Sequence, residues 1–184
     1  MRVITGSARG RKLTAPAGLE TRPTSDMTKE AVFSILQNQL ENSEVLDLFA
    51  GSGQMGIEAL SRGSRRAVFV DSAAQAISVI KSNLKACDMM DQSTVIQMDA
   101  QSYIKNSKSK FDIIILDPPY NKKLIDAVLP DAVRCMKEDG IILCETEKQE
   151  VLPQEQGQYA IAREYRYGKA KITVYRRKDE AECE

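Results

Sequence analysis

Apolar residues along this chain recur at two different spacings, and the change between them predicts alternating helices and strands. Val32, Leu36 and Leu40 are four residues apart, which is typical of one helix face, and we expect that helix over residues 24–40. The other expected helices are residues 55–62, 73–86, 124–136 and a short one containing Tyr103, and the expected strands are residues 45–49, 67–70, 94–98, 112–116 and 141–144. This alternation predicts a parallel sheet with helices on both faces, whose ligands bind at the carboxyl ends of the strands.

The two ends of the chain have patterns of their own. Residues 2–5 and 12–15 flank a glycine-bounded turn and predict a small β-hairpin, and residues 159–167 and 171–176 alternate around Gly168-Lys169 as a second hairpin. We therefore predict one α/β domain with a mostly parallel seven-stranded sheet, a C-terminal antiparallel hairpin and a small N-terminal hairpin extension. Its parts are the extension at residues 1–20, the core at residues 21–178 and an acidic tail at residues 179–184.

Composition narrows the class of protein. The 184 residues are 42% hydrophobic and 28% charged, which fits a single globular domain. No run approaches the roughly 20 apolar residues of a membrane span and the N-terminus lacks a signal peptide, so we expect a cytoplasmic protein without a membrane partner. The four cysteines have no CxxC spacing, which favours free thiols over a metal or redox site. The chain has no histidine, which excludes histidine as general base, nucleophile activator or metal ligand.

The net charge is zero, but the charges are unevenly distributed. Basic residues cluster near both ends of the chain, and they are Arg2, Arg9, Arg11, Lys12, Arg163, Arg166, Lys169, Lys171, Arg176, Arg177 and Lys178. Such clusters fit either an ordinary solvated surface or a basic face for nucleic acid, and charge alone leaves both interpretations open.

A glycine turn follows the first strand of the alternating series and opens a helix. The segment Leu46-Asp47-Leu48-Phe49-Ala50-Gly51-Ser52-Gly53 continues to Gly56, and Asp71 follows the first glycine by about 20 residues, as a ribose-hydroxyl acceptor would. This spacing indicates a nicotinamide dinucleotide or S-adenosyl-L-methionine. Asp47 and the later pair Asp99-Ala100 favour the second cofactor, because the nicotinamide fingerprint requires neither. Each acid also has a structural interpretation: Asp47 could cap the turn, Asp71 the next helix, and Asp99 could be an ordinary loop residue.

The tetrapeptide Asp117-Pro118-Pro119-Tyr120 comes directly after the apolar run 111–116. Its prolines restrict the backbone and lack N–H donors, which holds the Asp117 and Pro118 oxygens in a stiff loop that can accept from an N–H₂ group. Tyr120 adds a ring on which a base can stack. The tetrapeptide alone fits either a plain proline-rich turn or chemistry on an exocyclic amine, and its place after the fourth strand of this series favours the amine.

These motifs together resemble class I S-adenosylmethionine-dependent methyltransferases, whose fold is Rossmann-like. The match is closest to the RsmD family of small-subunit (16S) rRNA guanine-N2 methyltransferases and runs from Arg2 to about Arg177. The segments that carry it are Gly10-Arg11-Lys12-Leu13, Thr21-Arg22-Pro23-Thr24-Ser25-Asp26 with Lys29-Glu30, and Gly56-Ile57-Glu58-Ala59-Leu60-Ser61-Arg62-Gly63. Two residues depart from the family pattern: Met27, where a basic residue is common, and Gln54, where a small one is usual.

The resemblance implies a role for each motif residue. The glycine turn would lie against the methionine part of the cofactor, with Asp47 at its amino group, Asp71 at the ribose and Asp99-Ala100 at the adenine. The implied cofactor residues are Asp47, Phe49, Ala50, Gly51, Ser52, Gly53, Asp71, Asp99, Ala100 and Thr24. The implied catalytic residues are Asp117, Pro118, Pro119 and Tyr120.

RNA would be held by the basic residues of the N-terminal hairpin, Arg9, Arg11 and Lys12, together with Arg22, although Arg22 could instead pair with a nearby acid. By resemblance the partner is 16S rRNA in an assembling or assembled small ribosomal subunit, and we expect a monomer without a metal. Three alternatives remain: a methyltransferase for adenine N6 or a protein glutamine amide, a nicotinamide-dependent oxidoreductase, and a non-catalytic RNA-binding protein.

Overall fold

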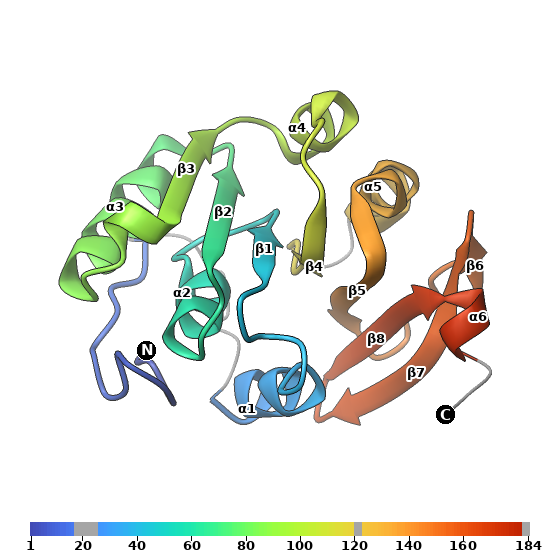
Figure 1. Ribbon diagram of the computed structural model, residues 1–184, viewed down its shortest axis with the longest axis horizontal. Coiled ribbons are helices and arrows are strands. Elements are labelled where there is room, and N and C mark those ends of the chain that lie inside the picture. The colour runs from blue at the N-terminus through green and yellow to red at the C-terminus, as the bar shows by residue number, and fades with distance from the viewer. Residues whose placement is uncertain (17–25, 120–122, 182–184) are drawn as a thin grey trace.

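The computed structural model describes residues 1–16, 26–119 and 123–181. Within them, eight strands form one sheet in the order β3-β2-β1-β4-β5-β8-β7-β6 (Figure 1). The strands β3 to β5 in that order are parallel, and β8, β7 and β6 add antiparallel pairs at one edge. The strands are β1 (Glu44–Asp47), β2 (Arg66–Asp71), β3 (Ser93–Gln97), β4 (Phe111–Leu116), β5 (Met136–Glu147), β6 (Glu155–Gln156), β7 (Tyr159–Tyr167) and β8 (Ala170–Arg177).

Helices cover both faces of this sheet. They are α1 (Asp26–Ile35), α2 (Gln54–Ser61), α3 (Ala74–Ala86), α4 (Ala100–Asn106), α5 (Leu124–Arg134) and α6 (Lys178–Ala181), with a 3₁₀ turn η1 (Met90–Gln92). Successive strand residues point to opposite faces, so Val45 packs in the apolar cluster with α1, α2 and α3, whereas Leu46 packs with α4 and α5. The predicted Rossmann-like α/β fold with its C-terminal antiparallel hairpin is confirmed.

Several predicted boundaries are wrong, and each has a physical reason. Helix α1 ends at Ile35 rather than residue 40, yet Leu36 and Leu40 are buried from the turns that follow, so the apolar period outlasts the helix. Strand β5 begins at Met136, where we expected the end of a helix, because this residue pairs with Phe111 before a register shift. Within the described residues, the sheet has one strand more than the seven predicted. This additional strand, β6, has two residues and is too short to give a recognisable period of apolar residues.

The N-terminal segment, residues 1–16, is called the N-terminal arm below. Its predicted hairpin forms one antiparallel bridge, between Arg2 and Lys12, beside which the Val3 N–H donates to the Arg11 carbonyl oxygen at 2.9 Å and the Leu13 N–H to the Met1 carbonyl oxygen at 3.1 Å. The backbone between these strands also bonds to α2. The N–H groups of Ile4 and Thr5 donate to the Glu58 carboxylate at 2.8 and 3.0 Å. A Cβ at Gly6 would lie 1.6 Å from the Ser61 carbonyl oxygen, so only glycine permits this approach.

A buried ion network fastens the arm to two helices. Glu58 of α2 and Lys29 of α1 both have side chains with 0% exposure, and the Lys29 Nζ lies 3.7 Å from Glu58 Oε2. The Lys29 Nζ also donates to the Arg2 carbonyl oxygen at 2.6 Å, and Arg62 Nε donates to Glu58 Oε1 at 2.8 Å. Burial lowers the pKa of Lys29, and the Glu58 carboxylate opposes this shift.

Candidate active site

Three aspartates stand at the carboxyl ends of neighbouring parallel strands. Asp47 ends β1, Asp71 ends β2, and Asp117 directly follows β4. Asp47 is 1% exposed, and burial raises its pKa to about 7; the N–H of Gly56 opposes this shift, while the charges of Asp117 and Asp71 add to it. This edge of the sheet therefore concentrates negative charge, which favours a cationic ligand.

The predicted glycine turn lies between β1 and α2. Gly51 and Gly53 have φ angles of +54° and +77°, which glycine adopts at little cost. The N–H of Gly51 donates to Asp71 Oδ2 at 2.9 Å, and the N–H of Ala73 donates to Asp71 Oδ1 at 2.9 Å. Asp71 thus joins the turn to Ala73, the N-cap residue of α3, without itself capping the helix, and each of its oxygens keeps a second lone pair for a ligand.

The third glycine of the motif brings α2 close to the sheet. A Cβ on Gly56 would lie 2.3 Å from Phe69 Cε1, and the Gly56 N–H donates to Asp47 Oδ2 at 3.0 Å. Close packing here therefore fixes the position of the buried carboxylate. Gln54, at the first position of α2, is 8% exposed, and its Oε1 has no hydrogen-bond partner among the described residues.

Other predicted cofactor residues line the same turn. Phe49 is half-buried against the cluster that contains α4 and α5, and Ala50 is buried in the opposite cluster. Ser52 is buried, and its carbonyl oxygen accepts from Asn83 Nδ2 of α3 at 2.9 Å. The turn is thus anchored on both sides of the sheet.

Asp99 and Ala100 follow β3 at the same edge. Asp99 is the N-cap of α4, and its carboxylate accepts from the Ser102 N–H at 2.9 Å; Ala100 is buried. The exposed Asp99 therefore has a capping role, and its contact with adenine stays a prediction. Thr24 lies outside the described residues.

The loop Asp117-Pro118-Pro119-Tyr120 is described in part. Asp117 is half-buried, Pro118 is buried and Pro119 is exposed. Tyr120 lies outside the described residues, as does Arg22. The described part brings a carboxylate and a proline-stiffened carbonyl beside the glycine turn, since β1 and β4 are neighbours.

The two basic clusters differ in how their charges are paired. Much of the C-terminal cluster is paired: Lys171 Nζ lies 2.8 Å from Glu164 Oε1, Arg177 pairs with Glu138 and Asp179, and Lys178 pairs with Glu155. In the N-terminal arm, the exposed side chains of Arg9, Arg11 and Lys12 make no ion pair with any described residue. The arm therefore presents the more available positive charge.

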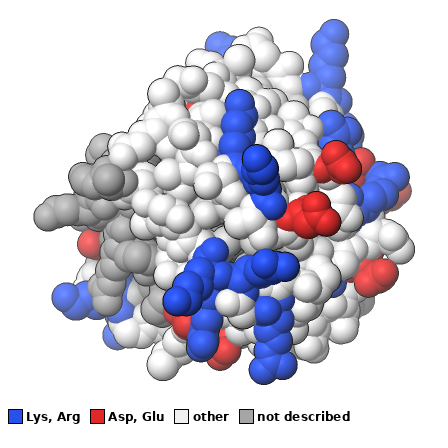
Figure 2. Space-filling model, turned by 90° about the vertical axis from the view of Figure 1, so that its left-hand side faces the viewer, with Lys and Arg blue, Asp and Glu red and all other residues white. Residues whose placement is uncertain are grey.

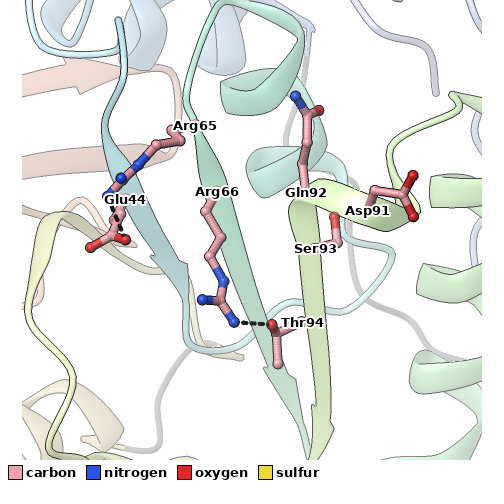
Figure 3. Close-up of a pocket in the computed structure, with 7 residues that line it drawn as sticks. All are labelled: Glu44, Arg65, Arg66, Asp91, Gln92, Ser93 and Thr94. Carbon is pink, nitrogen blue, oxygen red and sulfur yellow. Dashed lines mark hydrogen bonds and ion pairs between the residues drawn. The ribbon is translucent and has the colours of Figure 1, made fainter.

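A shallow cavity of about 300 Å³ lies at the opposite, amino-terminal edge of the sheet (Figure 3). Its charged side chains engage one another or neighbouring hydroxyls: Arg65 pairs with Glu44 at 2.7 Å, and Arg66 donates to Thr94 Oγ1 at 2.8 Å. The aspartates and the glycine turn lie at the other edge, so this cavity is not part of the candidate site.

Three further features concern the described residues as a whole. They contain no group of three or more Cys, Asp or Glu side chains placed to hold a metal ion. No helix among them is both long and apolar enough to cross a membrane. Cys87, Cys135 and Cys144 are buried free thiols, as predicted.

Sequence reasoning gave no role to two residues that position the site. Glu58 holds the arm, and Asn83 of α3 bonds both the backbone of Thr14 and the carbonyl of Ser52. Asn83 lies three residues after Ile80 and four before Cys87, on the apolar face of α3, and a polar residue at an apolar position of a helix is the signal that could have identified it. Glu58 gives no such signal, because its neighbours three and four residues away include the polar Gln54, Ser61 and Arg62.

The parallel sheet, the glycine turn after β1 and the acidic carboxyl edge define a Rossmann-like α/β protein of the methyltransferase type. The family model described as "Conserved hypothetical protein 95" matches residues 1–176. The chain belongs to this family, and the resemblance drawn from its motifs is confirmed.

Individual relatives cover nearly the whole chain. The Bacillus subtilis protein YlbH is 39% identical over 183 residues, which are 97% of this chain and 100% of the relative. Ribosomal RNA small subunit methyltransferase D of Haemophilus influenzae is 34% identical over 159 residues, 83% of this chain and 81% of the relative. The solved structure of Escherichia coli yhhF is 29% identical with a TM-score of 0.86, covering 96% of this chain and 97% of that chain.

Proposed function

We propose that this protein transfers a methyl group from S-adenosyl-L-methionine to the exocyclic N2 of a guanine in 16S rRNA. The name of the Haemophilus influenzae relative supports small-subunit rRNA as the substrate. The observation that carries the proposal is the arrangement of Asp117-Pro118 after β4, beside the buried Asp47 and the glycine turn after β1. Asp rather than Asn at the head of the loop favours guanine N2 over adenine N6 or a glutamine amide.

The residues at the carboxyl edge suit this cofactor. S-adenosyl-L-methionine supplies a methyl group on a positively charged sulfonium and also carries an ammonium group. Asp47, with its raised pKa, and its neighbours Asp71 and Asp117 form a negative edge that a cationic ligand would neutralise. Gly51 and Gly53 leave backbone without side chains where the cofactor would approach, and Asp71 keeps lone pairs for hydroxyl groups.

Asp117 and Pro118 would orient the amine. The lone pair of guanine N2 is delocalised into the ring, so alignment matters more than a strong base. The Asp117 carboxylate and the Pro118 carbonyl would each accept one N–H, which favours a pyramidal nitrogen with its lone pair directed away from the loop. Positive charge develops on that nitrogen during transfer, where Asp117 stabilises it and then accepts the proton. Tyr120 would stack on the base.

Asp117→Ala tests the proposed role directly. We expect methyl transfer to fall by at least about 100-fold, because a transition-state acceptor is lost, while S-adenosylhomocysteine binding survives. Asp139→Ala, an exposed carboxylate on β5, is the matched control and should behave as wild type. Near-normal turnover in Asp117→Ala would refute the role of this loop.

The substrate is identified by offering wild-type protein both isolated small subunits and naked 16S rRNA, then digesting the RNA for mass analysis. N2-methylguanine is expected. N6-methyladenine would overturn the choice of base, and methyl transfer to protein alone would overturn RNA as the substrate. Thermal stabilisation by NAD instead of S-adenosylhomocysteine would indicate an oxidoreductase.

The arm is the proposed RNA grip. Replacing Arg9, Arg11 and Lys12 by Ala should weaken rRNA binding and flatten its salt dependence, with no change in cofactor affinity. An unchanged salt dependence would assign RNA binding to another surface, with the C-terminal basic cluster as the next candidate.

A further inference from the structure

Helix α3 carries a stripe of exposed polar side chains that no motif explains. Ser78, Lys81, Ser82 and Lys85 are all exposed, and Ser78 and Ser82, like Lys81 and Lys85, are four residues apart, so the two pairs form neighbouring rows on one side of the helix. The opposite face is buried and apolar except for Asn83. The helix contains no acidic residue, so its charged side chains are both positive.

The N-terminal arm docks against this helix. The Thr14 N–H donates to Asn83 Oδ1 at 2.9 Å, and Asn83 Nδ2 returns a bond to the Thr14 carbonyl oxygen at 3.0 Å. Burial raises the pKa of the Cys87 thiol, the C-cap residue of α3, and the charge of Arg11 opposes this shift, so Arg11 lies near this end of the helix. Arm and helix therefore form one continuous surface, and Lys and Arg side chains gather on that side of the molecule (Figure 2).

This surface has the composition of a phosphate-binding face. Residues 1–16 contain no acid, and Lys81 and Lys85, like Arg9, Arg11 and Lys12, make no ion pair with any described residue. Lysine and serine side chains are common donors to phosphate oxygens. The large exposed apolar residues of the described chain, Met27, Met90, Met98 and Val151, lie outside both the arm and α3, so nothing here suits insertion into a lipid layer.

The helix also points from the candidate site to the arm. It begins three residues after Asp71, whose carboxylate accepts from the Ala73 N–H, and its last turn carries Lys85. An RNA strand bound along the stripe would therefore run from the carboxyl edge of the sheet, at the start of α3, to the N-terminal arm, at the end of α3.

We propose that the α3 stripe, Ser78, Lys81, Ser82 and Lys85, binds the RNA sugar–phosphate backbone and extends the grip of the N-terminal arm. This inference rests on the proposed function, because it takes RNA as the partner. Lys81 and Lys85 neutralise phosphates without reading bases, so the stripe positions RNA rather than selecting its sequence.

The test compares Lys81→Ala/Lys85→Ala with a control of equal charge change, Lys105→Ala/Lys108→Ala. The control lysines are exposed on and just after α4, which covers the other face of the sheet. Binding to transcribed 16S rRNA and to isolated small subunits is measured as a function of salt. If each lysine meets one phosphate, the α3 variant should lose about 1.4–1.8 from the log–log salt slope, and the control should lose nothing.

Two further measurements separate RNA contact from a structural role. Lys81→Arg/Lys85→Arg should retain the wild-type slope, and S-adenosylhomocysteine affinity should be unchanged in every variant. If the α3 variant keeps the wild-type slope while wild type binds and methylates rRNA, this inference fails and the proposed function stands. If wild type neither binds nor methylates rRNA, the proposed function fails. Lysine-dependent binding to phosphatidylglycerol vesicles, with RNA binding unaffected, would overturn the choice of partner.

Discussion

Glu58→Gln should strongly destabilise the protein, although Glu58 is outside the proposed active site. The carboxylate accepts from two backbone N–H groups of the arm and from Arg62 Nε, and its Oε2 lies 3.7 Å from the Lys29 Nζ. Glutamine offers one acceptor oxygen where the network uses two, and it removes the larger of the two carboxylate charges that favour the buried Lys29 ammonium, the other being that of Asp26. Breaking a buried ion pair at one partner typically costs about 3–5 kcal/mol, a large fraction of the roughly 5–15 kcal/mol that holds a domain folded.

A double variant measures the interaction energy between Lys29 and Glu58. Lys29→Met/Glu58→Gln removes the stranded ammonium, so its loss of stability should be smaller than the sum of the single losses by about 0.5–3 kcal/mol. Glu138→Gln is the matched control: this glutamate is 83% exposed and pairs with Arg177, so its loss should stay below about 1 kcal/mol.

The pH dependence gives a second readout. Because burial lowers the pKa of Lys29, the folded state binds fewer protons than the unfolded chain between that lowered pKa and the ordinary value of 10.5, and stability rises with pH across this window. Loss of the Glu58 charge lowers the pKa of Lys29 further, so the pH range over which stability rises begins at a lower pH. The deficit of Glu58→Gln relative to wild type should therefore shrink between about pH 7 and pH 9.5, and the double variant should lack this trend.

Urea unfolding followed by circular dichroism measures wild type, the single variants Glu58→Gln and Lys29→Met, the double variant and the Glu138→Gln control at both pH values. Wild-type stability in Glu58→Gln, or an equal deficit at both pH values, would refute the buried-charge argument. The arm should also loosen in this variant, which faster trypsin cleavage after its basic residues would report.

Three further predictions concern single positions. Gly56→Ala places a Cβ 2.3 Å from Phe69 Cε1, and urea unfolding should show a loss of about 1–3 kcal/mol; a loss near zero would contradict the close packing. The pKa of Asp47 is raised to about 7, so its ionisation opposes folding as the pH rises from 3.8 through 7. Asp47→Asn does not ionise there, so the stability of this variant minus that of wild type should be larger at pH 8 than at pH 5. Asn83→Ala leaves the Thr14 backbone groups without their side-chain partner and should cost about 1–3 kcal/mol by thermal unfolding, together with faster proteolysis of the arm.

The sequence predicted the order of the main elements because the apolar period directly reports burial. The position of Asp71 at the end of its strand followed from period and spacing, whereas Asp47 ends β1 although it lay inside the strand expected over residues 45–49. The helix end at Ile35 did not, because Leu36 continues the apolar period from a turn. Local pattern does not distinguish a buried turn residue from a buried helix residue.

The contacts of the arm were also beyond local pattern. The hydrogen bonds from Ile4 and Thr5 to Glu58 span more than fifty residues of sequence, and the pair between Lys29 and Glu58 joins two helices. Nothing in the local pattern around Lys29 indicates that its side chain is fully buried. The capping role of Asp99 was not predicted, because the sequence pattern suggested only a contact with adenine or an ordinary loop residue.

Although the net charge of the chain is zero, the sign of the surface charge changes along helix α3. Asp71 stands before the first turn of α3, where the helix dipole favours a negative charge, and Lys85 stands in the last turn, where it favours a positive one. Over the roughly 20 Å of a 13-residue helix, the surface changes from one suited to a cationic cofactor to one suited to phosphates. A methyltransferase that acts on RNA needs both environments side by side, and a uniformly basic protein would place its cofactor in an unfavourable field. Neutrality overall is therefore compatible with RNA binding, because the charges are separated along α3 rather than absent.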